Sequence, residues 1–233
     1  MTSGDSMASI KENLQKIRQN IEQACMRAGR RPDDVRIVAV TKYVNEARAR
    51  EAVEAGLTHI GENRLEGLIA KRRALADLDV TWHFIGTLQS RKVKDVLPQV
   101  DYIHSLDRLS LAKEIQKRAE RAVKCFVQVN VSGEATKHGI REEEVLPFID
   151  RLREFPNITV VGLMTMAPAN AEEDELRRIS RRLKNWQRAV EKKHWEHAPC
   201  HELSMGMSRD YIIAVEEGAT FVRIGSALVG NDG

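Results

Sequence analysis

Eight short apolar runs, each followed by a longer segment, constrain the fold of this chain more than any other feature. The runs are continuous in hydrophobicity rather than alternating, which is typical of strands buried on both faces of a parallel sheet. Eight strand–helix units in roughly 200 residues predict an α/β chain folded as a (β/α)8 TIM barrel. The runs cover residues 36–40, 59–61, 82–86, 102–104, 124–131, 159–164, 202–204 and 221–224.

Helical spacing predicts the elements between these runs and one extra helix before them. The extra helix has apolar residues three and four positions apart from Ile10 to Ala28. Ser9 and Glu12 form a capping-box pattern at its start, and Gly29 is expected to end it. The other helices are expected at residues 46–55, 64–75, 109–122, 143–153, 172–193 and 210–217.

The rival fold is an open, doubly wound sheet, which carries a glycine-rich turn after its first strand. The sequence contains neither GxGxxG nor GxxxxGK[ST], so the barrel is preferred. Because it also lacks a linker or repeat, all 233 residues are expected to form one domain. Residues 1–8 are expected to be flexible or left over from expression.

Composition excludes several classes of protein. The chain is 42% hydrophobic and 30% charged, which excludes a disordered chain, and its net charge of +3 indicates no polyanionic partner. The basic segment 177–188 is therefore expected to be a solvated helix face. Cys25, Cys125 and Cys200 lie far apart without a CxxC pair, and no segment is apolar enough to span a bilayer. We expect a cytoplasmic protein that is a monomer.

The first apolar run ends directly before a lysine. Barrel enzymes gather functional groups at the carboxyl ends of their strands, and Lys42 follows the run 36–40. An amine next to an apolar run loses hydration, which favours the uncharged, nucleophilic form that attacks aldehydes and ketones. A lysine that extends into solvent fits this position equally well.

The loops after the seventh and eighth runs have the composition of a phosphate site. Ser208 is placed to cap the helix at 210–217, and Gly225 and Ser226 follow the eighth run. These two loops commonly bind phosphate in such barrels, through exposed backbone N–H groups and a helix N-terminus. Together they predict a phosphorylated ligand.

A nucleophilic lysine beside a phosphate site predicts a phosphorylated carbonyl compound, either pyridoxal phosphate or a sugar phosphate. Arg223, at the end of the eighth run, favours the former. An arginine that donates to a pyridine nitrogen keeps it unprotonated and weakens the ring as an electron sink. A structural arginine in an ion pair fits the spacing equally well.

Motifs from residue 38 onward resemble those of the pyridoxal phosphate homeostasis proteins, single-domain relatives of the alanine racemase barrel. They run in order along nearly the whole chain, which departs from many relatives in having arginine at position 91. The motifs are 38–42 (VAVTK), 61–63 (GEN), 83–86 (HFIG), 129–134 (VNVSGE), 162–166 (GLMTM), 203–208 (LSMGMS) and 222–225 (VRIG).

The resemblance implies a fold-type III barrel that binds pyridoxal 5′-phosphate (PLP). By this resemblance Lys42 forms a Schiff base with PLP and Arg223 faces the pyridine nitrogen. The other implied contacts are to the phosphate (Ser208, Gly225 and Ser226), to the ring (Asn63 and His83) and along the phosphate side (Met205 and Gly206).

The resemblance also implies a role in vitamin B6 homeostasis without established catalysis, with apo PLP enzymes as possible recipients. Racemases of this fold have a further β-domain whose tyrosine is the second base, and we expect none after Gly233. Tyr43 is expected to point away from Lys42, while Tyr102 opens a strand and Tyr211 lies in a helix. The alternative function is a PLP-dependent racemase or decarboxylase of low activity.

Two further groups of residues suggest additional hypotheses. Lys137, after the fifth run, is either a solvated lysine or a second amine that accepts PLP in transit. His194, His197, Cys200 and His201 are metal-ligand types, but their loop setting favours an incidental cluster, so no metal is expected.

Overall fold

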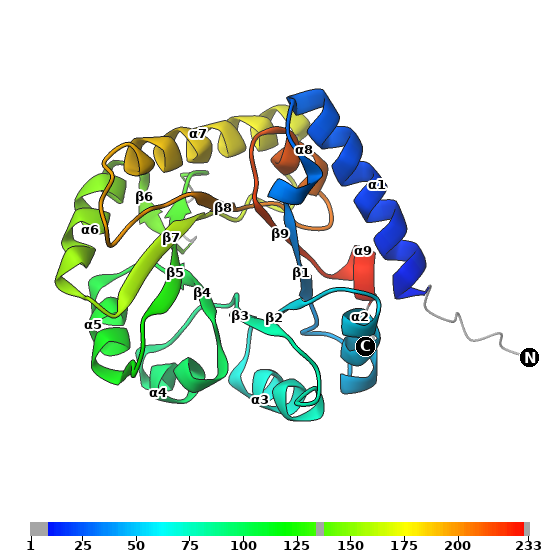
Figure 1. Ribbon diagram of the computed structural model, residues 1–233. Coiled ribbons are helices and arrows are strands. Elements are labelled where there is room, and N and C mark those ends of the chain that lie inside the picture. Colours follow the sequence, from blue (N-terminus) through cyan, green and yellow to red (C-terminus); the bar gives the residue numbers. More distant parts are fainter. Residues whose placement is uncertain (1–8, 134–137, 231–233) are drawn as a thin grey trace, which may run out of the picture.

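Eight parallel strands form a closed barrel in the computed structural model, which describes residues 9–133 and 138–230 (Figure 1). Neighbouring strands follow chain order, and β4 pairs with β5 while β9 pairs with β1, so the sheet closes. The predicted TIM barrel is confirmed. The strands are β1 (Arg36–Val40), β2 (His59–Glu62), β3 (Thr81–Phe84), β4 (Tyr102–Leu106), β5 (Val123–Asn130), β7 (Ile158–Met164), β8 (Glu202–Ser204) and β9 (Phe221–Ile224), with a short β6 (Ile140–Arg141) beside β5.

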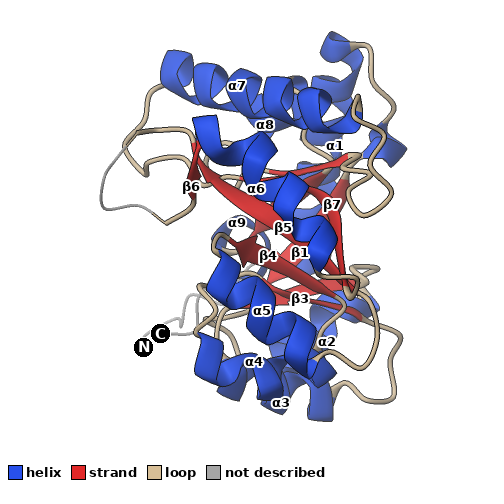
Figure 2. Cartoon of the chain, turned by 90° about the vertical axis from the view of Figure 1, so that its left-hand side faces the viewer, coloured by secondary structure: helices blue, strands red, loops and turns tan. Residues whose placement is uncertain are grey.

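Helices cover the outside of the barrel, as Figure 2 shows from the side. The expected extra helix is α1, which packs against α8 and α9. The helices are α1 (Ile10–Ala28), α2 (Glu46–Glu54), α3 (Leu65–Ala74), α4 (Val93–Val96), α5 (Leu109–Arg118), α6 (Val145–Arg151), α7 (Glu173–Glu191), α8 (Tyr211–Glu216) and α9 (Ser226–Val229).

The two ends of α1 differ in how well the sequence predicts them. Gly29 ends the helix in the left-handed conformation, with φ 66°, as expected. The predicted capping box is wrong, because the Ser9 side chain makes no capping hydrogen bond. The Ser9 carbonyl instead accepts a hydrogen bond from the Asn13 N–H, and Asn13 also donates to the carbonyl of Leu228 in α9.

The apolar core has two parts. The larger part fills the space between the strands and the surrounding helices. The smaller part lies inside the barrel and consists of Val38, Phe126, Met164 and Phe221. The three cysteines are buried as free thiols, and burial raises the pKa of Cys125 and Cys200 to about 12. These two thiols are therefore poor nucleophiles at neutral pH.

The basic face of α7 is exposed, as expected, and is paired with carboxylates. Arg177 contacts Glu216 and Glu217, and Arg182 contacts Glu142 at 2.7 Å. Because these arginines are paired with carboxylates, this face offers less unpaired positive charge for binding a polyanion. Among the described residues, no helix is both long and apolar enough to cross a membrane.

Candidate functional site

Lys42 lies at the carboxyl end of the barrel, where three cavities meet. The arginine cavity, of about 330 Å³, is also lined by Asn63 and Arg223. The serine cavity, of about 470 Å³, is lined by the loops after β8 and β9, and the outer cavity, of about 690 Å³, lies between the loops after β2 and β3. The half-buried Lys42 amine can therefore reach ligands in any of the three.

A buried ion pair holds the turn that carries Lys42. Thr41 donates its hydroxyl hydrogen to Glu62 at 2.7 Å, and the ammonium of Lys71 contacts both Glu62 and the Thr41 carbonyl. Glu62 and Lys71 are 1% and 5% exposed. A buried pair satisfied by further hydrogen bonds resists displacement, because separating either partner leaves an unpaired charge. The turn after β1 is thus anchored to β2 and α3.

This anchor was absent from the sequence predictions, although a signal for it exists. Lys71 lies three residues after Leu68 and four before Leu75, both of which are buried. A lysine on the buried face of an amphipathic helix needs a partner of opposite charge. The nearest preceding strand end supplies it in Glu62.

Arg223 projects from β9 into the arginine cavity and is only 3% exposed. Its guanidinium donates to the Ser204 hydroxyl and, at 3.0 Å, to the Thr165 carbonyl. Both partners are neutral, so the ion-paired structural arginine considered as an alternative is not what the described residues form. Burial lowers the pKa of Arg223 to about 10, which still leaves it cationic at neutral pH.

The loops after β8 and β9 meet at the serine cavity. Ser208 was expected to cap α8, but this is wrong because the helix begins later and its cap is Asp210. The Asp210 carboxylate accepts the Met207 N–H at 2.6 Å. The Ser208 hydroxyl instead accepts the Ala227 N–H at 3.2 Å, which ties the loop after β8 to α9. Gly225 and Ser226 line the same cavity.

Three of the residues expected at the site, His83, Met205 and Gly206, line none of the three cavities. His83 is fully buried inside the barrel and stacks on Tyr102. Met205 packs in the core outside the strands. Gly206 has φ 101° and lies so close to α8 that an added Cβ would be 2.7 Å from the Ala214 Cβ. Gly206 therefore positions the loop rather than lining a cavity.

Tyr43 lies beside Lys42 rather than pointing away from it. The strand ends at Val40 and a turn follows, so the alternation of side chains expected for a strand does not continue. The Lys42 amine is 4.9 Å from the centre of the Tyr43 ring, which is 60% exposed. Tyr102 opens β4 and Tyr211 opens α8, as expected.

The two remaining hypotheses concern the loops after β5 and α7. Lys137 lies outside the described residues. In the loop after α7, His197 bonds to the Ile149 carbonyl and His201 to Glu191, each at 2.8 Å. Among residues 9–133 and 138–230, no group of three potential ligands could hold a metal ion.

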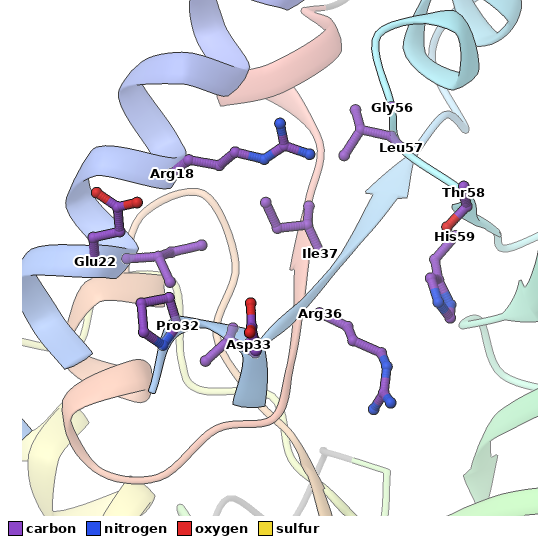
Figure 3. Close-up of a pocket in the computed structure, with 12 residues that line it drawn as sticks. Arg18, Glu22, Pro32, Asp33, Arg36, Ile37, Gly56, Leu57, Thr58 and His59 are labelled. Carbon is purple, nitrogen blue, oxygen red and sulfur yellow. The ribbon is translucent and has the colours of Figure 1, made fainter. Parts of the chain in front are cut away.

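A further cavity, which we call the basal cavity, lies at the opposite end of the barrel (Figure 3). It has a volume of about 520 Å³ and lies between α1 and the amino ends of β1 and β2. Its charged lining residues have both signs: two are arginines (Arg18 and Arg36) and two are acidic (Glu22 and Asp33). His59 lines it from β2.

Comparison with known proteins gives one family and a set of full-length relatives. The model of the alanine racemase N-terminal domain matches residues 13–232. The pyridoxal phosphate homeostasis protein of Aquifex aeolicus is 41% identical over 222 residues, covering 94% of this chain and 96% of that protein. The protein of the same name from Pseudomonas aeruginosa is 37% identical and covers 96% of each chain.

Solved structures agree with the sequence comparison. PipY of Synechococcus elongatus with PLP bound has a TM-score of 0.83 and 32% identity, covering 95% of this chain and all of that one. An unknown protein from Bifidobacterium adolescentis has a TM-score of 0.90 and 32% identity, with 94% of each chain covered. Alanine racemase from Corynebacterium glutamicum, at 16% identity and a TM-score of 0.73, shares the fold over 60% of its own length.

Proposed function

Because the chain belongs to the pyridoxal phosphate homeostasis protein family, we propose that it binds PLP through Lys42 and holds it for other proteins. The observation that carries this proposal is the meeting of an amine, a buried guanidinium and two loop hydroxyls around adjoining cavities. PLP has three groups to match them, an aldehyde, a pyridine nitrogen and a phosphate. The residues present therefore fit this cofactor.

The covalent anchor is assigned to Lys42. PLP supplies an aldehyde, which condenses with a primary amine with loss of water. Thr41, Glu62 and Lys71 fix the backbone turn, so that only the Lys42 side chain has to be ordered when the ligand binds. Asn63 lines the arginine cavity next to Lys42 and is assigned to the ring.

Arg223 is assigned to the pyridine nitrogen, and this favours storage over catalysis. Arginine is a donor only and stays charged, so it keeps a facing ring nitrogen unprotonated. An unprotonated ring is a weaker electron sink for reactions at an attached amino acid. A site built in this way holds the cofactor without activating it strongly.

The phosphate is assigned to the serine cavity. Ser208 and Ser226 offer hydroxyl groups there, and Gly225 allows a close approach of the backbone. Ser208 also links the two loops through the Ala227 N–H, which keeps the cavity in shape. Met205 packs in the core and Gly206 packs against Ala214 of α8, so both hold the loop after β8 beside the serine cavity.

Three buried, unpaired thiols suit a reducing compartment, so we propose a cytoplasmic location with apo PLP enzymes as recipients. The alternative function is a racemase or decarboxylase of low activity. Tyr43 is the observation in its favour, because a phenol beside Lys42 could serve as a second acid–base group.

The proposal is tested by titrating the purified protein with PLP and recording its near-visible absorbance before and after borohydride. The wild type should gain a yellow band that borohydride abolishes, Lys42→Ala should not, and Lys92→Ala should behave as wild type. Lys92 is the matched control because it lines the outer cavity but not the other two. A protein that stays colourless would contradict PLP binding and favour a sugar-phosphate carbonyl ligand.

The same preparation separates carrier from enzyme. The loaded protein should reactivate an apo PLP enzyme and should not racemise or decarboxylate amino acids above the rate of free PLP. Turnover that is lost in Tyr43→Phe would support the enzyme instead.

A further inference from the structure

Three histidines and a serine form a continuous line of hydrogen bonds through the barrel that ends at Arg223. His59 Nδ1 lies 2.8 Å from His83 Nε2, and His83 Nδ1 lies 2.8 Å from His104 Nε2. His104 Nδ1 lies 2.9 Å from the Ser204 hydroxyl, which also accepts a hydrogen bond from Arg223. The line joins the basal cavity, which His59 lines, to the arginine cavity.

The chemistry of the groups fixes the direction of every hydrogen bond in this line. Arginine can only donate, so the Ser204 oxygen is the acceptor from Arg223. Among the described residues, His104 Nδ1 is the other hydrogen-bond partner of this buried hydroxyl, and it must therefore accept the serine hydrogen.

A neutral imidazole has one donor and one acceptor nitrogen, so each assignment determines the next. His104 accepts at Nδ1 and must donate from Nε2 to His83 Nδ1. His83 then donates from Nε2 to His59 Nδ1. All three rings carry their hydrogen on Nε2, and the last one, on His59, lies at the end of the line near the basal cavity.

This arrangement is electrostatically favourable for Arg223. Each imidazole turns its lone pair toward the guanidinium and its N–H away from it, so the dipoles align with the buried cation and strengthen one another. They add to the favourable charge of Asp210, which acts on Arg223 without a hydrogen bond, since both hydrogen-bond partners of Arg223 among the described residues are neutral.

The rings are also held in place and kept neutral. His83 stacks on Tyr102 at 4.5 Å between ring centres, and His104 stacks on Phe126 at 4.3 Å. Burial lowers the pKa of both His83 and His104 well below the ordinary value, so neither becomes charged near neutral pH. The line therefore keeps one direction.

We propose that Ser204, His104, His83 and His59 are positioning residues for Arg223, which they hold charged and aimed into the arginine cavity through a line of histidines locked in the Nε2–H form. The tautomer pattern stands on the protein alone. Its effect on PLP binding rests on the proposed function.

The tautomers can be read directly by ¹⁵N NMR of histidine-labelled protein without ligand. We expect Nε2–H for His59, His83 and His104. An Nδ1–H form of any of the three in the wild type would overturn the inference. In Arg223→Leu the direction is no longer imposed, so Nδ1–H signals should appear, and a pattern identical to wild type would contradict the role of the arginine.

Ser105→Ala is the matched control for these variants. Ser105 follows His104 in β4, is also buried, and its hydroxyl has no hydrogen-bond partner among the described residues. Removing this hydroxyl should change neither the tautomers nor PLP affinity, whereas Ser204→Ala should change both. Circular dichroism confirms that each variant is folded before it is compared.

The link to the ligand is tested by PLP affinity and absorbance. Losing one buried hydrogen bond to Arg223 should weaken PLP binding roughly three- to tenfold in Ser204→Ala and shift the absorbance of bound PLP, while Ser204→Thr should restore both. Wild-type affinity and spectrum in Ser204→Ala would contradict the positioning role. A wild type that binds no PLP would contradict the proposed function instead, and the NMR result on ligand-free protein would then decide the inference.

Discussion

Both ends of the barrel present an arginine from a barrel strand, Arg36 in β1 and Arg223 in β9, but their surroundings differ. The Arg36 side chain is 51% exposed and lies 3.8 Å from the carboxylate of Glu202. Arg223 is 3% exposed and bonds only to neutral groups among the described residues. The basal cavity beside Arg36 is larger than the arginine cavity, at about 520 against 330 Å³.

The comparison shows that the burial of the arginine, more than the volume of the cavity beside it, distinguishes the two ends of this barrel. Exposed charges of both signs satisfy one another and water at the basal end, at little energetic cost. A buried cation whose hydrogen-bond partners are neutral costs free energy to keep, and a ligand that accepts its remaining N–H groups recovers part of that cost. The carboxyl end is therefore the end prepared for a ligand.

The largest difference between the two ends should be in stability. Glu62→Gln breaks the buried pair with Lys71 and should lower the free energy of unfolding by about 3 kcal/mol or more. Glu202→Gln, which affects the looser pair with Arg36, should cost less than about 1 kcal/mol. Urea denaturation at pH 7 measures both, and equal losses would remove the distinction between the ends.

The buried histidines should make stability depend on pH. The pKa values of His83 and His104 in the folded protein lie below their unfolded value, mainly because of burial. Nearby His59 and Lys124 lower the pKa of His83 further, and nearby His83, Arg223 and His59 lower that of His104. Below pH 6.5 the unfolded chain binds protons that the folded chain does not, so stability falls as pH falls. Two histidines that stay neutral in the folded state should lower stability by about 2.4 kcal/mol between pH 6 and 5.

Denaturation curves at several pH values measure this decrease. His194→Gln, which changes a histidine outside the barrel, serves as the control and should retain it. His59, whose pKa burial also lowers, lies near Arg36, Lys124 and Asp101 and should steepen the curve further. A flat profile between pH 6 and 5 would show that the barrel histidines are not buried in the neutral form.

Exchanging the two arginines for methionine compares the ends in ligand binding. Arg223→Met removes a charged hydrogen bond to the ligand and should weaken PLP binding by about 10- to 100-fold. Arg36→Met should change PLP affinity less than about twofold, because Arg36 lines only the basal cavity among those described. A larger effect from Arg36 than from Arg223 would reverse the assignment of the site.

The smallest effect is expected at the edge of the basal cavity. Arg18 is exposed on α1, so Arg18→Ala should alter stability by less than about 0.5 kcal/mol and leave PLP affinity unchanged. Thermal unfolding and PLP titration of this variant provide the check. A loss of PLP affinity would show that the basal cavity takes part in binding.

Elements with a local signal could be predicted from the sequence. The eight strands, α1 and the end of α1 at Gly29 follow from hydrophobic spacing and from glycine at a left-handed position. Lys42 and the loops after β8 and β9 were located by the rule that such barrels gather function at the carboxyl ends of strands. The N-cap of α8 was predicted at the wrong residue because the start of this helix depends on the path of the preceding loop. That path is set by the close packing of Gly206 against Ala214, which no local pattern reveals.

Features that depend on the stagger of the strands could not be predicted. His59, His83 and His104 are separated by 24 and 21 residues, and they meet because the parallel register pairs His59 with Thr81 and His83 with Tyr102. No local pattern gives this register. The ion pair of Glu62 and Lys71 can be predicted only in part, because the helical spacing reveals the buried lysine but not its partner.

Binding of PLP through Lys42 is tested by locating the lysine to which PLP is attached. The PLP-loaded wild type is reduced with borohydride, digested and mapped by mass spectrometry. We expect the added mass on Lys42 and an unmodified Lys92. Modification spread over surface lysines, or found on a lysine outside the arginine and serine cavities, would contradict binding through Lys42.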